Sequence, residues 1–205
     1  SLPRSEYGRY DMYSGNGQSR LLQAVKFAVS ETYSTTDVKG DGQVVVVRFS
    51  DGMKFELLPA FEHMDCWGSF VSYDYPDTHM GGRWLATDPK AEQEAMKEKN
   101  ASSRGLLFDT CKHIRNVHAA NFSSYRLSGI VIDSFVFSAI GDWHWTDGES
   151  SAPAGAYEMR LLDEFDRLSL QGAVPFALYS PGSQQAIDTA KSYECLGKVL
   201  RQMAC

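Results

Sequence analysis

"FSDGMKFELLPAF", residues 49–61, contains a segment with the residue alternation of a β-strand, and a carboxylate, Glu56, stands in the middle of that segment. The β-branched run "QVVVVRF" at 43–49 precedes it, and Ser50-Asp51-Gly52 supplies a turn between the two segments. The pattern therefore predicts an antiparallel hairpin whose second strand ends at Pro59. The apolar rhythm of this second strand is typical of a buried strand.

Glu56 is the residue that this hairpin leaves to be explained. Successive side chains of a strand point to opposite faces, so Glu56 faces away from the core if Phe55 and Leu57 face into it. An ionised carboxylate beside a core is costly unless it is paired, hydrogen-bonded or bound to a cation. The local pattern leaves two interpretations open, an ordinary exposed glutamate and a cation ligand.

The rest of the first 86 residues predicts one helix and a long connection. "GNGQSRLLQAVKFAVSETY" at 15–33 has helical apolar spacing. The apolar positions of this helix are Leu21, Leu22, Val25, Val29 and approximately Phe27. "TTDVKGDGQ" at 35–43 predicts a turn. Residues 61–86 are aromatic and glycine-rich without a clear period, which predicts a long ordered surface connection.

From residue 87 onward the chain is predicted to be helical. Asp88 can cap a helix that starts at Pro89 and has early glutamates and late lysines, which suits the helix dipole. Further amphipathic helices are expected at 103–118, 128–140, 157–170 and 184–203, with a loop at 141–155. The β-branched content of 128–140 leaves a strand open as the alternative there. The predicted fold class is α+β, with a mixed domain at 1–86 and a helical domain at 87–205.

Composition limits the classes of function. The 205 residues are 43% hydrophobic and 22% charged with a net charge of −6, which is typical of a soluble globular protein and disfavours nonspecific binding to nucleic acid. No apolar run approaches the length of a membrane span, and residues 1–10 lack the pattern of a secretory signal. Four cysteines without a C-x-x-C pair favour reduced thiols in a cytosol and argue against zinc.

Two stretches resemble template-independent nucleotidyltransferases. Glu56-Leu57-Leu58-Pro59-Ala60-Phe61 is similar to the third-carboxylate strand of the family that includes 2'-5'-oligoadenylate synthetase, cyclic GMP-AMP synthase and the bacterial CD-NTases of the SMODS group. "FSSYRLSG" at 122–129 resembles the Phe-Ser-Ser-Tyr element of cyclic GMP-AMP synthase, with Lys112 about one helix upstream. "GNGQSRLLQAVK" and "GGRWLATDPK" also resemble the bacterial group. The resemblance covers approximately 15–141 and implies a DNA polymerase β-like palm packed on a helical bundle.

The resemblance also implies a role for each matched residue. In the family, three carboxylates hold two Mg²⁺ (or Mn²⁺) ions that activate a sugar hydroxyl and neutralise the transferring phosphoryl group. Glu56 would be the third carboxylate and so both catalytic and metal-binding. Lys112 would hold the triphosphate with hydroxyl bonds from Ser123 and Ser124, and Tyr125 would stack on the base.

Each of these roles has a simpler alternative. Lys112 can be a solvated surface lysine, Ser123 and Ser124 can cap the next helix, and Tyr125 can be a packing residue. The family's Gly-Ser element and its Asp-x-Asp pair have no match at 1–19. We therefore expect a palm that is incomplete at its N-terminus, in either a fragment of an enzyme or a degenerate relative.

The predicted function follows from the resemblance. It implies a cytoplasmic enzyme that makes a cyclic di- or oligonucleotide messenger from nucleoside triphosphates, ATP first and GTP as a further candidate, for bacterial antiviral signalling through a downstream effector. A membrane or a strongly bound nucleic acid is not expected as a partner. The alternative is a catalytically inactive nucleotide-binding or scaffolding protein of the same fold.

Overall fold

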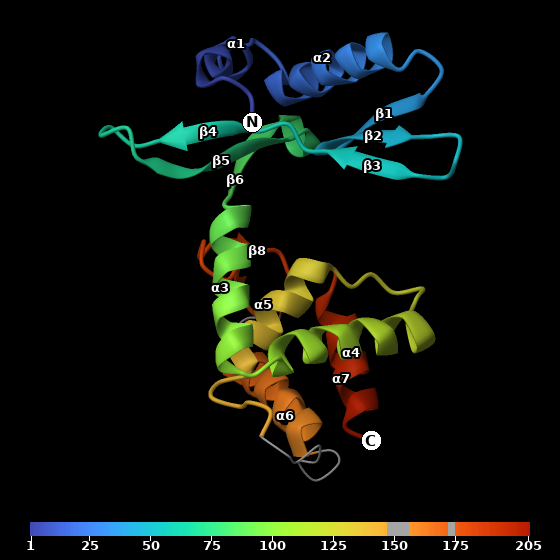
Figure 1. Cartoon of the computed structure of the whole chain (residues 1–205), viewed down its shortest axis with the longest axis vertical. Helices are drawn as coiled ribbons and strands as arrows, with labels where there is room; N and C mark the ends of the chain where they lie inside the picture. Colours follow the sequence, from blue (N-terminus) through green and yellow to red (C-terminus); the bar gives the residue numbers. More distant parts are fainter. Residues whose placement is uncertain (147–155, 172–174) are drawn as a thin grey trace. The chain divides into compact units, whose positions relative to one another are not determined.

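Two three-stranded antiparallel sheets follow one another along the first part of the chain (Figure 1). The computed structural model describes residues 1–146, 156–171 and 175–205. The chain divides into two compact units, 1–88 and 89–205, each with its own core. Of the loop expected at 141–155, residues 147–155 lie outside the described residues.

The first sheet contains the predicted hairpin. Its strands are β1 (Asp37–Asp41), β2 (Val44–Arg48) and β3 (Lys54–Leu57), in the order β1-β2-β3. The hairpin of β2 and β3 is confirmed, and Gly52 takes a φ of +87° in its turn. The turn expected at 35–43 is wrong for 37–41, which form β1. It is confirmed at both ends of the segment, at 35–36 before β1 and at Gly42, with a φ of +60°, between β1 and β2.

The second sheet replaces the connection that we expected at 61–86. Its strands are β4 (Phe61–Met64), β5 (Phe70–Asp77) and β6 (Arg83–Thr87), in the order β4-β5-β6. The prediction failed because three of the buried positions of β5 are polar, Ser72, Asp74 and Asp77. Polar residues at buried positions remove the apolar alternation by which a strand is recognised.

Helices cover one side of these sheets (Figure 1). They are a 3₁₀ turn at Arg4–Glu6, α1 (Tyr7–Asp11) and α2 (Gly17–Thr32), and a second 3₁₀ turn occurs at His79–Gly81. The predicted helix α2 buries Leu22 against Val45 and Val47 of β2. Phe27 was assigned wrongly to its apolar face, since 65% of that residue is exposed.

The second unit is mainly helical. Its elements are α3 (Pro89–Ser102), α4 (Leu106–Asn121), α5 (Gly129–Ala139), α6 (Ala156–Gln171), β7 (Leu178–Tyr179), β8 (Ala186–Ile187) and α7 (Tyr193–Met203). Buried side chains such as Ile114, Phe135, Leu161 and Leu196 bring α4 to α7 together. The segment 128–140 is a helix, so its strand alternative is excluded. The helix expected at 184–203 is wrong in its first half, which contains β8 and turns.

Among the residues that the structure describes, no helix has both the length and the apolar composition needed to cross a membrane.

Candidate functional site

Glu56 lies in the edge strand β3, and the strand is not buried. All four residues of β3 are exposed, which corrects the expectation of a buried strand. Phe55 stands opposite Val47, and Glu56 stands opposite Val46. Because Val47 faces α2, Phe55 lies on the helix-covered face and Glu56 on the other. The predicted alternation is therefore confirmed.

The face that carries Glu56 is polar and charge-paired. The Glu56 carboxylate forms an ion pair with the ammonium of Lys54, with 2.5 Å between Oε1 and Nζ. The Glu56 side chain is 53% exposed. On the same face, Arg48 pairs with Asp37 at 3.4 Å. In the described part of the chain, no three residues among His, Cys, Asp and Glu are grouped to hold a metal ion. Glu56 is thus accessible to a ligand, but the residues around it do not form a metal site.

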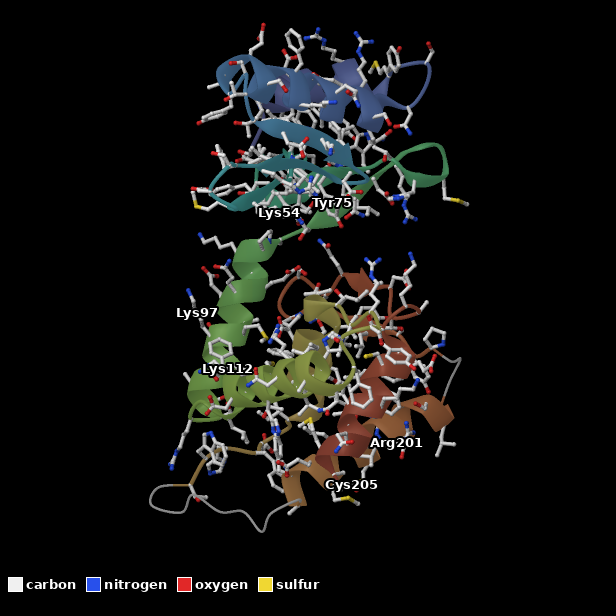
Figure 2. The ribbon with its side chains drawn as sticks, turned by 90° about the vertical axis from the view of Figure 1, so that its right-hand side faces the viewer. Lys54, Tyr75, Lys97, Lys112, Arg201 and Cys205 are labelled. Carbon is white, nitrogen blue, oxygen red and sulfur yellow. The ribbon has the colours of Figure 1, made fainter. Side chains whose placement is uncertain are left out.

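Lys112 lies on α4 (Figure 2), and its side chain extends into solvent. Its side chain is 74% exposed, and its nearest carboxylate oxygen is Oδ1 of Asp109 at 3.9 Å. Asp109 also accepts a hydrogen bond from the indole of Trp145 at 3.1 Å. The ammonium of Lys112 is therefore only loosely paired and can bind an anion.

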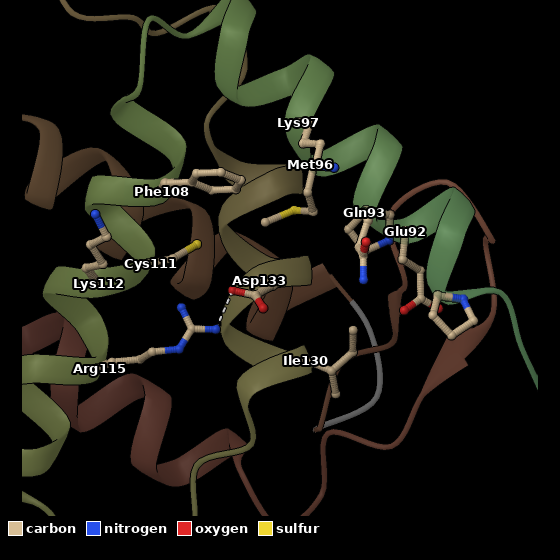
Figure 3. A pocket seen from close by; sticks show the side chains of 12 residues that line it. Glu92, Gln93, Met96, Lys97, Phe108, Cys111, Lys112, Arg115, Ile130 and Asp133 are labelled. Atoms are coloured by element: carbon tan, nitrogen blue, oxygen red, sulfur yellow. Dashed lines mark hydrogen bonds and ion pairs between the residues drawn. The ribbon is translucent and has the colours of Figure 1, made fainter. Parts of the chain in front are cut away.

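A cavity of about 460 Å³ lies beside Lys112, and all its lining residues belong to the second unit. Figure 3 shows Phe108 of α4 and Met96 of α3 pointing toward each other across it. Arg115 of α4 and Asp133 of α5 form an ion pair at 2.6 Å in its wall. The cavity thus combines apolar surface with a fixed polar pair.

Cys111 also lines this cavity but is a weak nucleophile. Burial raises the pKa of its thiol to about 12, and the nearby Asp133 carboxylate acts in the same direction. At neutral pH the sulfur is protonated, and thiols react through the thiolate. Cys111 contributes apolar surface rather than chemistry.

The Ser-Ser-Tyr loop follows the C-terminal end of α4. Ser123 and Ser124 are exposed. Neither caps α5, because Ser128 occupies its N-cap position. Tyr125 is 43% exposed, which excludes a purely internal packing role.

One face of the Tyr125 ring is already occupied. The ammonium of Lys198 of α7 lies 3.9 Å from the ring centroid, and it also pairs with Glu194 at 2.6 Å. The backbone carbonyl of Tyr125 lies 2.9 Å from Nε2 of His118. The position of Lys198 was not predictable from the sequence, because no local pattern links a residue of α7 to a loop that follows α4.

Within the second unit, Lys112 and the Ser-Ser-Tyr loop lie at different points along α4. Lys112 lies nine positions before the last residue of α4, which is about 13 Å along the helix axis. Tyr125, beyond that end, is not among the residues that line the cavity. Glu56 belongs to the first unit and the other four candidates belong to the second.

Comparisons with known proteins give one family match, over the first part of the chain, and several structural matches. Residues 1–100 match the Second Messenger Oligonucleotide or Dinucleotide Synthetase domain, abbreviated SMODS. One similar structure is a CdnE cyclic dinucleotide synthase from Elizabethkingia meningoseptica, solved with GTP and Apcpp. The aligned region covers 98% of this chain and 73% of the synthase, with a TM-score of 0.64. Residues 1–100 are thus similar to a SMODS domain, and the chain has the fold of the CD-NTase structure.

Two further structures support the same fold. The first is the CD-NTase CdnG from Bradyrhizobium diazoefficiens in complex with GTP. The aligned region covers 94% of this chain and 67% of CdnG, with a TM-score of 0.60. For a STING-associated CdnE c-di-GMP synthase from Capnocytophaga granulosa, the aligned region covers 92% of this chain and 62% of the synthase. The TM-score is again 0.60. Identity is 10% to the first two structures and 12% to the third, so these matches establish the fold. No curated protein sequence matches the chain.

These matches confirm the predicted α+β nucleotidyltransferase fold and the resemblance to the SMODS group. The individual roles assigned to Glu56, Lys112, Ser123, Ser124 and Tyr125 stay predictions.

Proposed function

We propose that this chain is a nucleotidyltransferase that joins nucleoside triphosphates into a cyclic di- or oligonucleotide messenger. The observation that carries the proposal is the SMODS match over 1–100, which includes the Glu56 strand. The three CD-NTase structures support it through the fold. ATP is the first candidate substrate and GTP the second.

Glu56 is the proposed catalytic carboxylate. Its half-exposed side chain can reach a substrate hydroxyl, and its ion pair with Lys54 is at the surface, where such pairs are weak. Glu56 by itself does not make a metal centre, and the described residues do not provide two further ligands near it. Its role as a ligand of Mg²⁺ or Mn²⁺ therefore requires carboxylates beyond those grouped around it.

The second unit carries the proposed nucleotide contacts. The loosely paired ammonium of Lys112 suits triphosphate oxygens, and the exposed hydroxyls of Ser123 and Ser124 are free to donate hydrogen bonds. A base that stacks on Tyr125 would use the ring face opposite Lys198.

The setting that we propose is signalling in the bacterial cytoplasm. The product would bind a downstream effector, and the pathway would serve antiviral defence. The STING-associated relative from Capnocytophaga granulosa supports this setting by analogy.

A catalytically inactive nucleotide-binding or scaffolding protein is the second candidate. The isolation of Glu56 from other metal-ligating residues in the described chain favours it. In that case Lys112 and Tyr125 would bind a nucleotide without turning it over.

Product analysis separates the two candidates. The protein is incubated with the four nucleoside triphosphates and Mg²⁺ or Mn²⁺, treated with phosphatase, and its products are separated by chromatography. The enzyme predicts a phosphatase-resistant oligonucleotide. Absence of any such product under conditions in which the protein binds ATP would contradict the enzyme and support the inactive protein.

A further inference from the structure

A second cavity, of about 350 Å³, lies in the second unit among residues of α4, α6 and α7. Trp145, which follows α5 in the sequence, completes its wall. The volume falls within the range of small-molecule pockets, about 300–1,000 Å³. This cavity shares no lining residue with the larger cavity beside Lys112, and Tyr125 does not line it. It is therefore separate from the residues already assigned to a nucleotide.

The charged side chains of this cavity are acidic. Asp109 and Glu158 line it, and its described lining residues include neither lysine nor arginine. The nearest printed cation is Lys112, whose ammonium lies 3.9 Å from Oδ1 of Asp109. Within the described part of the chain, the Glu158 carboxylate has no ion pair or hydrogen bond. Two carboxylates that lack a close cation favour a positively charged ligand.

The aromatic side chains around these carboxylates are held in place by other contacts. The indole N–H of Trp145 donates to Oδ2 of Asp109 at 3.1 Å. Tyr157 is buried, and its ring packs against Trp143 with 5.3 Å between the ring centroids. Because these walls are already ordered, binding requires little further ordering of side chains. A cation near an indole face is also stabilised by the ring, by about 0.5–2 kcal/mol.

The two carboxylates come from neighbouring positions of different helices. Asp109 of α4 and Glu158 of α6 adjoin Thr110 and Tyr157, whose hydroxyl oxygens lie 3.0 Å apart. Among the described residues, no three of the types His, Cys, Asp and Glu are grouped to hold a metal ion. Met203 of α7 adds an apolar side chain to the wall. A cation that carries a carbon chain fits this lining better than a bare metal ion, since it covers both the carboxylates and the apolar wall.

We propose that this cavity binds an organic cation of the aliphatic amine class. Its ammonium group contacts the carboxylates of Asp109 and Glu158. Its carbon chain lies against Trp145 and Met203. The site is additional to the proposed nucleotidyltransferase function and does not depend on it.

The probe for this site is 1,4-diaminobutane, titrated into the full chain by calorimetry at constant ionic strength. The comparison ligands are 1,4-butanediol, which has the same carbon chain without charge, and Mg²⁺. We expect the diamine to bind and the diol not to bind. The diamine should also raise the unfolding temperature increasingly with its concentration, because it binds the folded state.

Two variants remove the proposed contacts one at a time. Glu158→Gln removes a carboxylate at nearly constant volume, and Trp145→Leu removes the aromatic ring. Each should weaken the binding of the diamine by about fivefold or more. The matched controls are Asp163→Asn on α6 and Trp67→Ala, whose side chain is 88% exposed in the first unit. Neither control residue lines the cavity, so neither should change the affinity for the diamine.

Four results would overturn the proposal. The first is an unaltered protein that does not bind the diamine, and the second is equal affinity in the cavity variants and the controls. The third is a diol that binds as tightly as the diamine, which would mean that the charge is not used. The fourth is displacement of the diamine by an equal concentration of Mg²⁺, which would mean that the carboxylates hold a metal ion instead. None of these results bears on oligonucleotide synthesis, so the two proposals fail separately.

Discussion

Asp77 is the most completely satisfied buried carboxylate of the second sheet. One oxygen lies 2.7 Å from Nδ1 of His79, and the other accepts Nε–H of Arg83 at 2.9 Å. Burial alone would raise the pKa of Asp77, but the hydrogen bonds from His79 and Arg83 outweigh it and lower that pKa below the ordinary value of 3.8. The ionised form is therefore the one that the fold stabilises.

Asp77→Asn should lower the free energy of unfolding at pH 7 by about 2 kcal/mol. Because the folded-state pKa is lowered, the stabilisation is complete above the unfolded-state pKa and is lost as pH falls through the folded value. Urea unfolding of the protein and the variant between pH 7 and pH 3 measures how this stabilisation depends on pH. The difference in unfolding free energy should shrink toward pH 3, and a difference independent of pH would contradict the assignment.

The four cysteines should differ in reactivity. Burial raises the pKa of Cys111 to about 12 and also raises that of Cys195, whereas Cys66 and Cys205 are exposed. Alkylation at pH 8 followed by mass spectrometry should modify Cys66 and Cys205 first. Rapid labelling of Cys111 would show that its environment is more open than the structure indicates.

Residue types and spacing predicted only part of the candidate site. The period of two placed Glu56 opposite Phe55 and Leu57, and the register of β2 with β3 confirms it. The exposure of all three was not predictable, because it depends on whether another strand covers the edge of the sheet. Lys198 over Tyr125 was unpredictable for a similar reason, since tertiary packing alone brings them together.

At the scale of the element, α2 has the strongest cap of the first unit. The side chain of Asn16 accepts the backbone N–H of Ser19 at 2.8 Å and donates to the carbonyl of Thr78 at 3.0 Å. One side chain therefore ends a helix and attaches it to the segment after β5. The helical spacing of the apolar residues at 15–33 predicted this helix, and its position is confirmed.

Asn16→Ala should lower the free energy of unfolding by about 1–2 kcal/mol. Ser128→Ala is the matched control, because Ser128 stands at the N-cap of α5 without a side-chain capping bond. Chemical denaturation of both variants measures the effect. Equal losses at the two positions would mean that the capping bonds of Asn16 contribute nothing specific.

Helices and strands were predictable where their buried residues are apolar, and they were missed where their buried residues are polar. The helices α4 and α6 present apolar residues such as Ile114 and Leu161 at helical spacing, and both were expected. The strand β5 buries Ser72, Asp74 and Asp77 instead, and its sheet was missed. A buried carboxylate is acceptable only with its partners, and partners distant in sequence leave no local pattern.

At the scale of the whole molecule, the two units differ in their cores. Among the described residues of the second unit, one cluster of nineteen buried side chains holds the helices together. The cluster beneath α2 in the first unit has four, and a separate aromatic group surrounds Phe61. The stability of a domain rises with the apolar surface that it buries, so the second unit should be the more stable.

Residues 89–205 produced alone should unfold cooperatively on heating, and residues 1–88 should do so at a lower temperature or not at all. Circular dichroism on heating measures the unfolding temperatures of the two fragments and of the full chain. A first fragment that is more stable than the second would contradict the comparison of the cores.

The fold class followed from the sequence because several motifs, each only moderately specific, occur in the order and spacing of one family. The residues at 56–61 and 122–129 pointed together to the nucleotidyltransferases before any strand order was known. The SMODS match and the CD-NTase structures agree with that assignment. The chemistry at Glu56 is the part of the account that most requires a direct test.

That test is the rate of oligonucleotide synthesis by Glu56→Gln, compared with the unaltered protein and with Glu31→Gln on α2. We expect Glu56→Gln to lose at least about a hundredfold in rate, the size of effect seen when a group that stabilises a transition state is removed. Its unfolding free energy should change by less than about 1 kcal/mol, because the ion pair with Lys54 is exposed. Glu31→Gln should retain full activity. A Glu56→Gln protein that synthesises product at the unaltered rate would contradict the account.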